Sequence, residues 1–117
     1  MEQLNRIQLR GRIGNVRVNP VGDKSVCHFS VATNILYRNQ EGTAVEEATW
    51  HNCTLWSNKK YKDFDFLAVG RGVEVVGRIK NAKYTGTDGV ERYSSDIVVS
   101  DATILPEDEP LKAESAI

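Results

Sequence analysis

Hydrophobic and polar residues alternate along most of this chain, which is the pattern of strands that bury one face. The first such stretch, residues 4–13, places Ile7, Leu9 and Ile13 on one side and polar side chains on the other. Four further stretches with similar alternation are expected to be strands: residues 26–35, 45–56, 72–84 and 92–104. Their inward side chains are expected to include Cys27, Phe29 and Val31 in the first of these and Val73, Val75 and Ile79 in the third.

One segment departs from this period. Residues 57–67 space Tyr61, Phe64 and Leu67 as one face of a helix, and Ser57 is a suitable N-cap. We expect a short helix here that plugs one end of a barrel. Three strands, a helix and two strands is the order of the five-stranded OB barrel, although other small barrels share it. The predicted fold is therefore all-β, an OB-fold barrel with one short helix between strands 3 and 4.

The third expected strand carries the most informative chemistry. In an extended chain, Trp50 and Trp56 point to the same face, together with Asn52 and Thr54 that lie between them. A polar strand surface that carries aromatic rings suits stacking on unpaired nucleobases. Core or interface tryptophans of an ordinary sheet are the alternative, and this strand alone does not decide between the two.

The fourth expected strand presents a similar combination. Arg78, Lys80, Ala82 and Tyr84 share its outward parity, so two cations accompany an aromatic ring. Cations contact phosphates and rings stack on bases. Solvated surface charge would account for the cations, but it does not explain why outward rings accompany polar groups on two strands.

Composition adds modest limits. A chain of 117 residues, with 40% hydrophobic and 26% charged residues, suits one soluble globular domain. Residues 1–15 contain no apolar run, so neither a signal peptide nor a membrane span is expected and a cytoplasmic location is the default. Cys27 and Cys53 lack a metal-ligand spacing, and we interpret them as reduced, buried thiols.

Charge is distributed unevenly along the chain. Residues 1–105 carry 14 Lys and Arg against 12 Asp and Glu, whereas residues 106–117 carry one Lys against four acidic residues. The body is therefore mildly basic and the C-terminal segment is acidic. Pro106 and Pro110 bracket most of the acidic residues, and no periodic pattern follows. We expect a binding domain over residues 1–105 and a short acidic disordered tail over 106–117.

Four blocks occur in order along residues 4–105. They are residues 5–14 (NRIQLRGRIG), 29–34 (FSVATN), 50–56 (WHNCTLW) and 70–79 (GRGVEVVGRI). Single glycines in them are weak signals, but the ordered set with a Trp-His pair inside the third block is specific. With these blocks the chain resembles the bacterial single-stranded DNA-binding proteins. The resemblance implies an OB fold, usually a homotetramer, that coats single-stranded DNA in replication, recombination and repair, without catalysis or a cofactor.

The resemblance also implies roles for single residues. The base-stacking aromatics of the family fall on Tyr37, Trp50, Trp56 and Tyr84. The family commonly has Trp at the first and last of these positions and Phe at the third, so ring size is redistributed. By parity Tyr37 belongs with the inward residues, and only a bulge or turn near Ile35 would bring it to the binding face.

Basic residues along the expected binding path contact phosphates. They are Arg10, Arg12, Lys59, Lys60, Arg78, Lys80 and Lys83. For Lys59 and Lys60, the solvated side of the expected helix is the alternative interpretation.

Assembly is expected through the first strand. Its exposed Arg6, Gln8 and Arg10 can face the same strand of a second copy across a two-fold axis, in a homotetramer or a dimer. His51 matches a family position near the subunit interface, with a hydrogen-bonded core histidine as the competing account. Catalysis by His51 or His28 is not expected, because no nucleophile with a base and an orienting acid is discernible. No metal, cofactor or membrane partner is expected.

One departure from the family affects partners. Its members normally continue through a long Gly-, Pro- or Gln-rich linker to an acidic tip that recruits replication and repair enzymes. Here only residues 106–110 resemble an acidic segment, so such recruitment stays open. A shortened form suits a second copy, or one carried by a mobile element or phage.

Two rival classes remain. One is an interaction module on the same barrel, like the tailless primosomal replication protein N, which works as a dimer in a helicase-loading assembly. Aromatics at four stacking positions argue against it, because a scaffold does not need them. The other, an enzyme or small-ligand binder on a small barrel, has no supporting group of residues.

Overall fold

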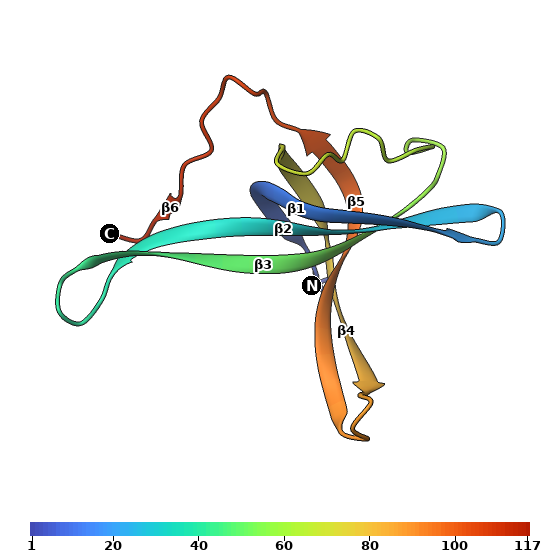
Figure 1. Ribbon diagram of the computed structural model, residues 1–117, viewed down its shortest axis with the longest axis horizontal. Helices are drawn as coiled ribbons and strands as arrows, with labels where there is room; N and C mark the ends of the chain where they lie inside the picture. The colour runs from blue at the N-terminus through green and yellow to red at the C-terminus, as the bar shows by residue number, and fades with distance from the viewer.

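Five long strands form a closed barrel in the computed structural model, which describes residues 1–117 (Figure 1). They are β1 (Ile7–Val21), β2 (Lys24–Arg38), β3 (Ala44–Trp56), β4 (Gly72–Thr85) and β5 (Glu91–Ile104). Their order is β1-β4-β5-β3-β2, and a further pairing between β1 and β2 closes the ring. β3 and β5 run parallel, whereas the other neighbours in the barrel are antiparallel. The five-stranded barrel of the predicted fold is confirmed.

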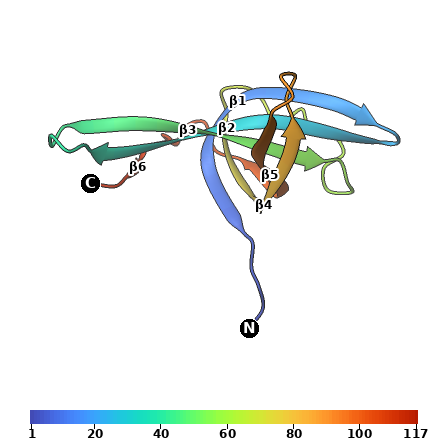
Figure 2. The same ribbon diagram turned by 90° about the horizontal axis from the view of Figure 1, so that it is seen from below.

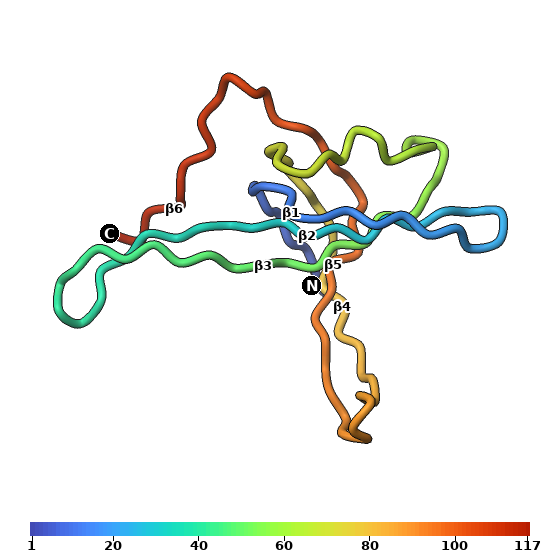
Figure 3. Tube along the Cα trace, in the orientation of Figure 1, coloured from blue at the N-terminus to red at the C-terminus, as the bar shows by residue number.

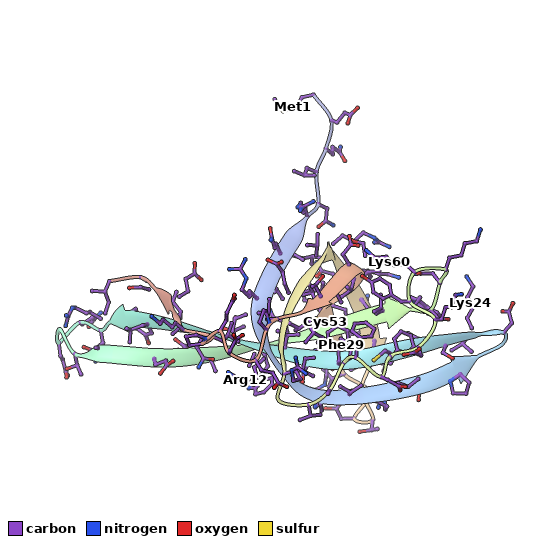
Figure 4. The ribbon with its side chains drawn as sticks, turned by 90° about the horizontal axis from the view of Figure 1, so that it is seen from above. Met1, Arg12, Lys24, Phe29, Cys53 and Lys60 are labelled. Carbon is purple, nitrogen blue, oxygen red and sulfur yellow. The ribbon has the colours of Figure 1, made fainter.

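Buried side chains follow the alternation seen in the sequence. Ile13 on β1 and Cys27, Phe29 and Val31 on β2 are all buried in one core. Phe29 lies beside Cys53 of β3 in the strand register, and both point into the barrel (Figure 4). Both cysteines are free thiols. Burial raises the pKa of Cys27 to about 11, so this thiol is protonated at neutral pH.

The predicted helix over residues 57–67 is wrong, because the segment is irregular and the structure contains no helix. Side chains in the segment compete for the backbone groups that a helix would use. The Oδ1 atom of Asn58 accepts hydrogen bonds from the backbone N–H groups of Lys60 (2.8 Å) and Tyr61 (3.0 Å). Asp63 forms a similar bond with the N–H group two residues later. Such local bonds favour turns over helix, and Asn and Asp are weak helix formers.

The apolar residues of this segment nevertheless close the barrel as expected. Tyr61, Phe64 and Leu67 are buried in the core cluster. Ser57, the expected N-cap, instead joins the segment to the start of β2. Its Oγ accepts a hydrogen bond from the backbone N–H of Ser25 at 2.9 Å. Burial of the apolar face therefore did not require helical backbone.

The ends of three hairpins, β1–β2, β2–β3 and β4–β5, project beyond the closed barrel (Figure 1). Gly22 and Gly89 have positive φ angles, 63° and 78°, at the turns of the first and last. One inward prediction fails on the last hairpin, where Ile79 is 42% exposed. Pairing of β1 with β4 ends at Ile7 and Gly77, so no neighbouring strand of the barrel covers Ile79 on that side.

The two ends of the chain lie outside the barrel. Residues 1–6 leave it as an extended segment (Figure 2). After β5 the chain passes back to β2, where the short strand β6 (Glu114–Ser115) pairs in parallel with Ile35 and Leu36 (Figure 3). An ion pair of 3.1 Å between Arg71 and Glu107 also holds this returning segment. No helix of sufficient length and apolarity to span a membrane is present.

Candidate functional site

The strand registers join the outward positions of β3 and β4 into one surface. Asn52 of β3 is the lateral neighbour of Asp96 of β5, which is the lateral neighbour of Lys80 of β4. Thr54 is connected in the same way, through one β5 residue, to Arg78. Lateral neighbours in a sheet point to the same side. We call this surface the outer face, and its β3 and β4 members are Trp50, Asn52, Thr54, Trp56, Arg78, Lys80, Ala82 and Tyr84.

Both tryptophans are exposed on the outer face. Trp50 is 60% and Trp56 is 42% exposed, so neither is a core residue of the barrel. The Trp50 ring lies over Gly14 of β1, where a Cβ atom would overlap Cζ3 of the indole. The missing side chain at Gly14 therefore lets the indole rest against the β1 backbone. No local pattern indicates this contact between Gly14 and Trp50, because β1 and β3 are distant in the sequence and the contact arises only in the fold.

The two tyrosines of the predicted stacking set differ in placement. Tyr84 is 49% exposed on the β4–β5 hairpin, opposite Arg92. Tyr37 lies opposite Val45 near the end of the β2–β3 hairpin, and the register between β2 and β3 has no bulge that would change its parity. The negative charge of Glu47 beside Tyr37 raises the pKa of the Tyr37 phenol. Two-stranded ribbons twist strongly, so parity alone does not fix the direction of a side chain that far from the barrel.

Four of the seven predicted phosphate-binding cations have partners within the protein. Polar contacts of 2.6–3.0 Å link Arg10 with Glu74, Arg12 with the carbonyl of Gly70, Lys60 with Asp101 and, as an ion pair, Lys83 with Glu91. The other three, Lys59, Arg78 and Lys80, form no ion pair or side-chain hydrogen bond. Exposed ion pairs contribute only about 0–1 kcal/mol, so an incoming phosphate can replace these carboxylates.

The exposed residues of β1 form one small network. Gln8 and Arg10 both donate to Oε1 of Glu74, at 2.9 and 2.8 Å. Both hydrogen bonds lower the pKa of Glu74, and the bond from Gln8 has the larger effect. Arg6 lies nearby in the sequence and is exposed. β1 pairs with β2 only from Arg12 onward, so the edge of residues 7–11 that faces away from β4 carries no strand.

His51 points to the opposite side from Trp50, as its parity predicts. It is half-buried, and its Nε2 atom lies 2.8 Å from Oγ1 of Thr33. Partial burial lowers the pKa of His51 and favours the neutral ring. The geometry contains the hydrogen bond expected of a structural histidine. No group of three or more His, Cys, Asp or Glu side chains is placed to hold a metal ion.

Three residues were missed from the sequence: Arg17 and Asp96 share the outer face, whereas Tyr93, the neighbour of Lys83, lies on the opposite side of the β4–β5 hairpin. Tyr93 of β5 is 73% exposed beside Lys83, Arg17 of β1 lies beside His28 of β2, and Asp96 lies beside Asn52. Tyr93 could have been found, because the Asp-Gly turn fixes the register of the β4–β5 hairpin. The other two depend on pairings between strands that are distant in sequence.

Comparison with known proteins identifies relatives over most of the chain. The single-strand binding protein family matches residues 4–105. A single-stranded DNA-binding protein of Neisseria meningitidis is 39% identical over 105 residues, which are 87% of this chain and 60% of that protein. One from Xanthomonas campestris is 31% identical over the same shares. The chain thus spans about 60% of the length of these curated relatives.

Solved structures agree with this result. A Plasmodium falciparum SSB in complex with ssDNA has a TM-score of 0.76 at 26% identity, covering 91% of this chain and 98% of that one. The single-stranded DNA binding protein from Thermus aquaticus, as a deletion mutant, has a TM-score of 0.72 at 19% identity. It covers 90% of this chain and 52% of that one, and it supports the fold alone.

Proposed function

The chain belongs to the single-strand binding protein family, and from this we propose that it binds and coats single-stranded DNA without regard to sequence. The observation that carries the proposal is the pair of exposed tryptophans, Trp50 and Trp56, on a polar strand surface. An exposed indole is not packed in the barrel core, and its apolar ring is poorly solvated by water. Stacking on a base covers this apolar surface. Replication, recombination and repair are the processes in which such coating would act.

We assign the chemistry to two groups of side chains. Bases stack on Trp50, Trp56 and Tyr84, with Tyr37 reached where the β2–β3 hairpin twists. Phosphates bind first to the unpaired Lys59, Arg78 and Lys80, and then to Arg10, Arg12, Lys60 and Lys83 as these release their partners. The affinity should therefore fall as salt rises, because phosphate contacts release counterions.

Titration with oligo-dT tests the function. Stacking should strongly quench the fluorescence of Trp50 and Trp56, with an affinity in the nanomolar range as an order of magnitude. Weak binding with little quenching would instead favour the tailless interaction module of a primosome-like assembly. The exposed aromatic residues favour the DNA-coating role over that alternative.

Assembly into a homotetramer is the accompanying proposal, with a dimer as the smaller possibility. The unpaired edge of β1 supports it, since free strand edges pair readily with another chain. Around this edge, Arg6, Gln8 and Arg10 would meet the same residues of a second copy, with His51 nearby. An isologous contact of this kind is self-complementary and closes on itself.

The acidic segment over residues 106–117 is proposed to compete with DNA. A cavity of about 740 Å³ has Arg10, Arg12 and Trp50 on one side and Leu111 and Glu114 of this segment on another. Deleting residues 106–117 should tighten oligo-dT binding about two- to fivefold at low salt and much less at high salt. Anisotropy of a labelled oligonucleotide, measured at both salt concentrations, checks this.

Charge can be separated from bulk in that experiment. A full-length variant with Glu107, Glu109 and Glu114 changed to Gln and Asp108 changed to Asn keeps the chain but removes the charges. It should reproduce the effect of the deletion. Equal affinities of all three proteins at low ionic strength would show that the segment does not reach the binding surface.

Gly14 is predicted to position Trp50. In Gly14→Ala the new Cβ atom overlaps the indole, and the ring rather than the backbone can move. We expect the fold to persist and oligo-dT binding to weaken about threefold, because a displaced ring stacks less well. The same substitution in a Trp50→Ala background should have no further effect on affinity. An additive loss there would mean that Gly14 acts independently of Trp50.

A further inference from the structure

A polar cavity of about 410 Å³ opens on the outer face beside the β3 residues that separate the two tryptophans. Four strands of the barrel contribute to its wall. The polar side chains in the wall belong to Asn15, Arg17, His28, Asn52, Thr54 and Asp96. Since Asn52 and Thr54 lie between Trp50 and Trp56 along β3, a strand stacked on both rings must pass over this cavity.

The polar groups in the cavity are largely free to bind a ligand. Thr54 and His28 form one long contact, 3.3 Å between Oγ1 and Nδ1. The side chains of Asn52, Arg17 and Asp96 form no hydrogen bond or ion pair within the protein. Lys80, the lateral neighbour of Asp96 on β4, does not form an ion pair with it. The carboxylate of Asp96 is thus half-buried, unpaired and directed at a cavity.

A free carboxylate is unexpected on a surface that binds phosphates. It repels the DNA backbone, so it weakens binding that depends on charge alone. A carboxylate can only accept hydrogen bonds, and on the DNA bases the matching donors are exocyclic amino groups. Cytosine offers its N4 amino group to such an acceptor, whereas thymine places the O4 oxygen at the same position.

We propose that this cavity is a base-reading subsite, in which Asp96 accepts a hydrogen bond from an exocyclic amino group and thereby favours cytosine over thymine. The inference rests on the proposed binding of single-stranded DNA. Asn52, beside Asp96, supplies an amide that can donate to the ring N3 or the O2 atom of the same cytosine. Stacking on Trp50 and Trp56 holds a strand of any sequence, and Asp96 adds a several-fold preference at one position of it, so binding stays general along the rest of the strand.

Matched pyrimidine oligonucleotides test the subsite. Dissociation constants of labelled oligo-dC and oligo-dT, about 15 nucleotides long, are measured by anisotropy for the wild type and for Asp96→Asn. Asparagine has the same shape, but it can donate to O4 of thymine. The ratio of the oligo-dT to the oligo-dC constant should fall about fivefold in Asp96→Asn, through tighter oligo-dT and weaker oligo-dC binding.

Charge and folding are controlled separately. Asp101→Asn removes the same charge from the same strand, outside the cavity wall, and should change both constants by one common factor. If Asp96→Asn unfolds, Asp96→Ser serves in its place, with the thermal melt as the check. If Asp96→Asn changes the dissociation constants of both oligonucleotides by the same factor, Asp96 affects binding only through its charge, and the proposed subsite is overturned. Absence of wild-type binding to both would instead overturn the DNA-binding function itself, and the subsite with it.

Discussion

Trp50→Ala and Trp56→Ala should each weaken oligo-dT binding about tenfold or more while leaving the fold intact. A base stacked on an aromatic ring contributes on the order of 1–3 kcal/mol, and 1.4 kcal/mol corresponds to a factor of ten. Because the two indoles are 60% and 42% exposed, their removal should lower the free energy of unfolding by less than the roughly 3–5 kcal/mol lost when a fully buried tryptophan is truncated. Anisotropy of a labelled oligonucleotide measures the first effect and thermal melting the second.

Two controls make this result specific. Val69→Ala removes a side chain that is 65% exposed but lies outside the strands, and it should leave affinity unchanged. Trp50→Phe keeps a smaller ring and should fall between the wild type and Trp50→Ala. An alanine variant that melts far earlier yet binds normally when folded would show that the tryptophan supports the barrel and not the DNA.

Strand faces were predictable from the sequence because alternation is a local property. Trp50 and Trp56 share a face whatever their neighbours are, since successive side chains on any strand point to opposite sides. The same rule placed Phe29 and Val31 in the core. It failed at Ile79, because whether an inward position is covered depends on how far β1 extends along β4. That limit is set by tertiary pairing, which no local pattern contains.

The helix error has a different cause. The spacing of Tyr61, Phe64 and Leu67 correctly predicted which side chains are buried, and the core includes all three. It did not determine the backbone, because Asn58 and Asp63 satisfy nearby N–H groups without a helix. An apolar spacing is therefore evidence for a buried face, and side chains that bond locally decide the conformation that presents it.

In the candidate site, the positions of the exposed aromatic side chains were easier to predict than which cations are free of protein partners. Whether a cation is free depends on partners far along the chain, such as Glu74 for Arg10 or Asp101 for Lys60. The cavity around Asp96 is harder still to predict from the sequence, because the strands that form it, β3 and β5, pair over only three residue pairs. Outward parity identifies such a carboxylate, but only the parallel register places it beside Asn52.

Assembly links the unpaired edge of β1 to DNA binding. One barrel has only three predicted phosphate contacts that are free of protein partners, Lys59, Arg78 and Lys80, so a single copy should bind a short strand weakly. Each OB fold covers about 4–16 nucleotides. Several copies joined by closed symmetry let one long strand pass from the tryptophans of one barrel to those of the next.

Affinity should therefore rise steeply with oligonucleotide length, by more than about tenfold between roughly 15 and 35 nucleotides, because later barrels bind an already tethered strand. Light scattering should give a mass about four times the 13.1 kDa chain. Dilution provides the internal control, since a protein dissociated to monomers should lose the length dependence while still binding the shorter strand. A stable dimer that binds both lengths equally would contradict wrapping, because two tethered barrels would then gain nothing from a longer strand, and it would favour the interaction module.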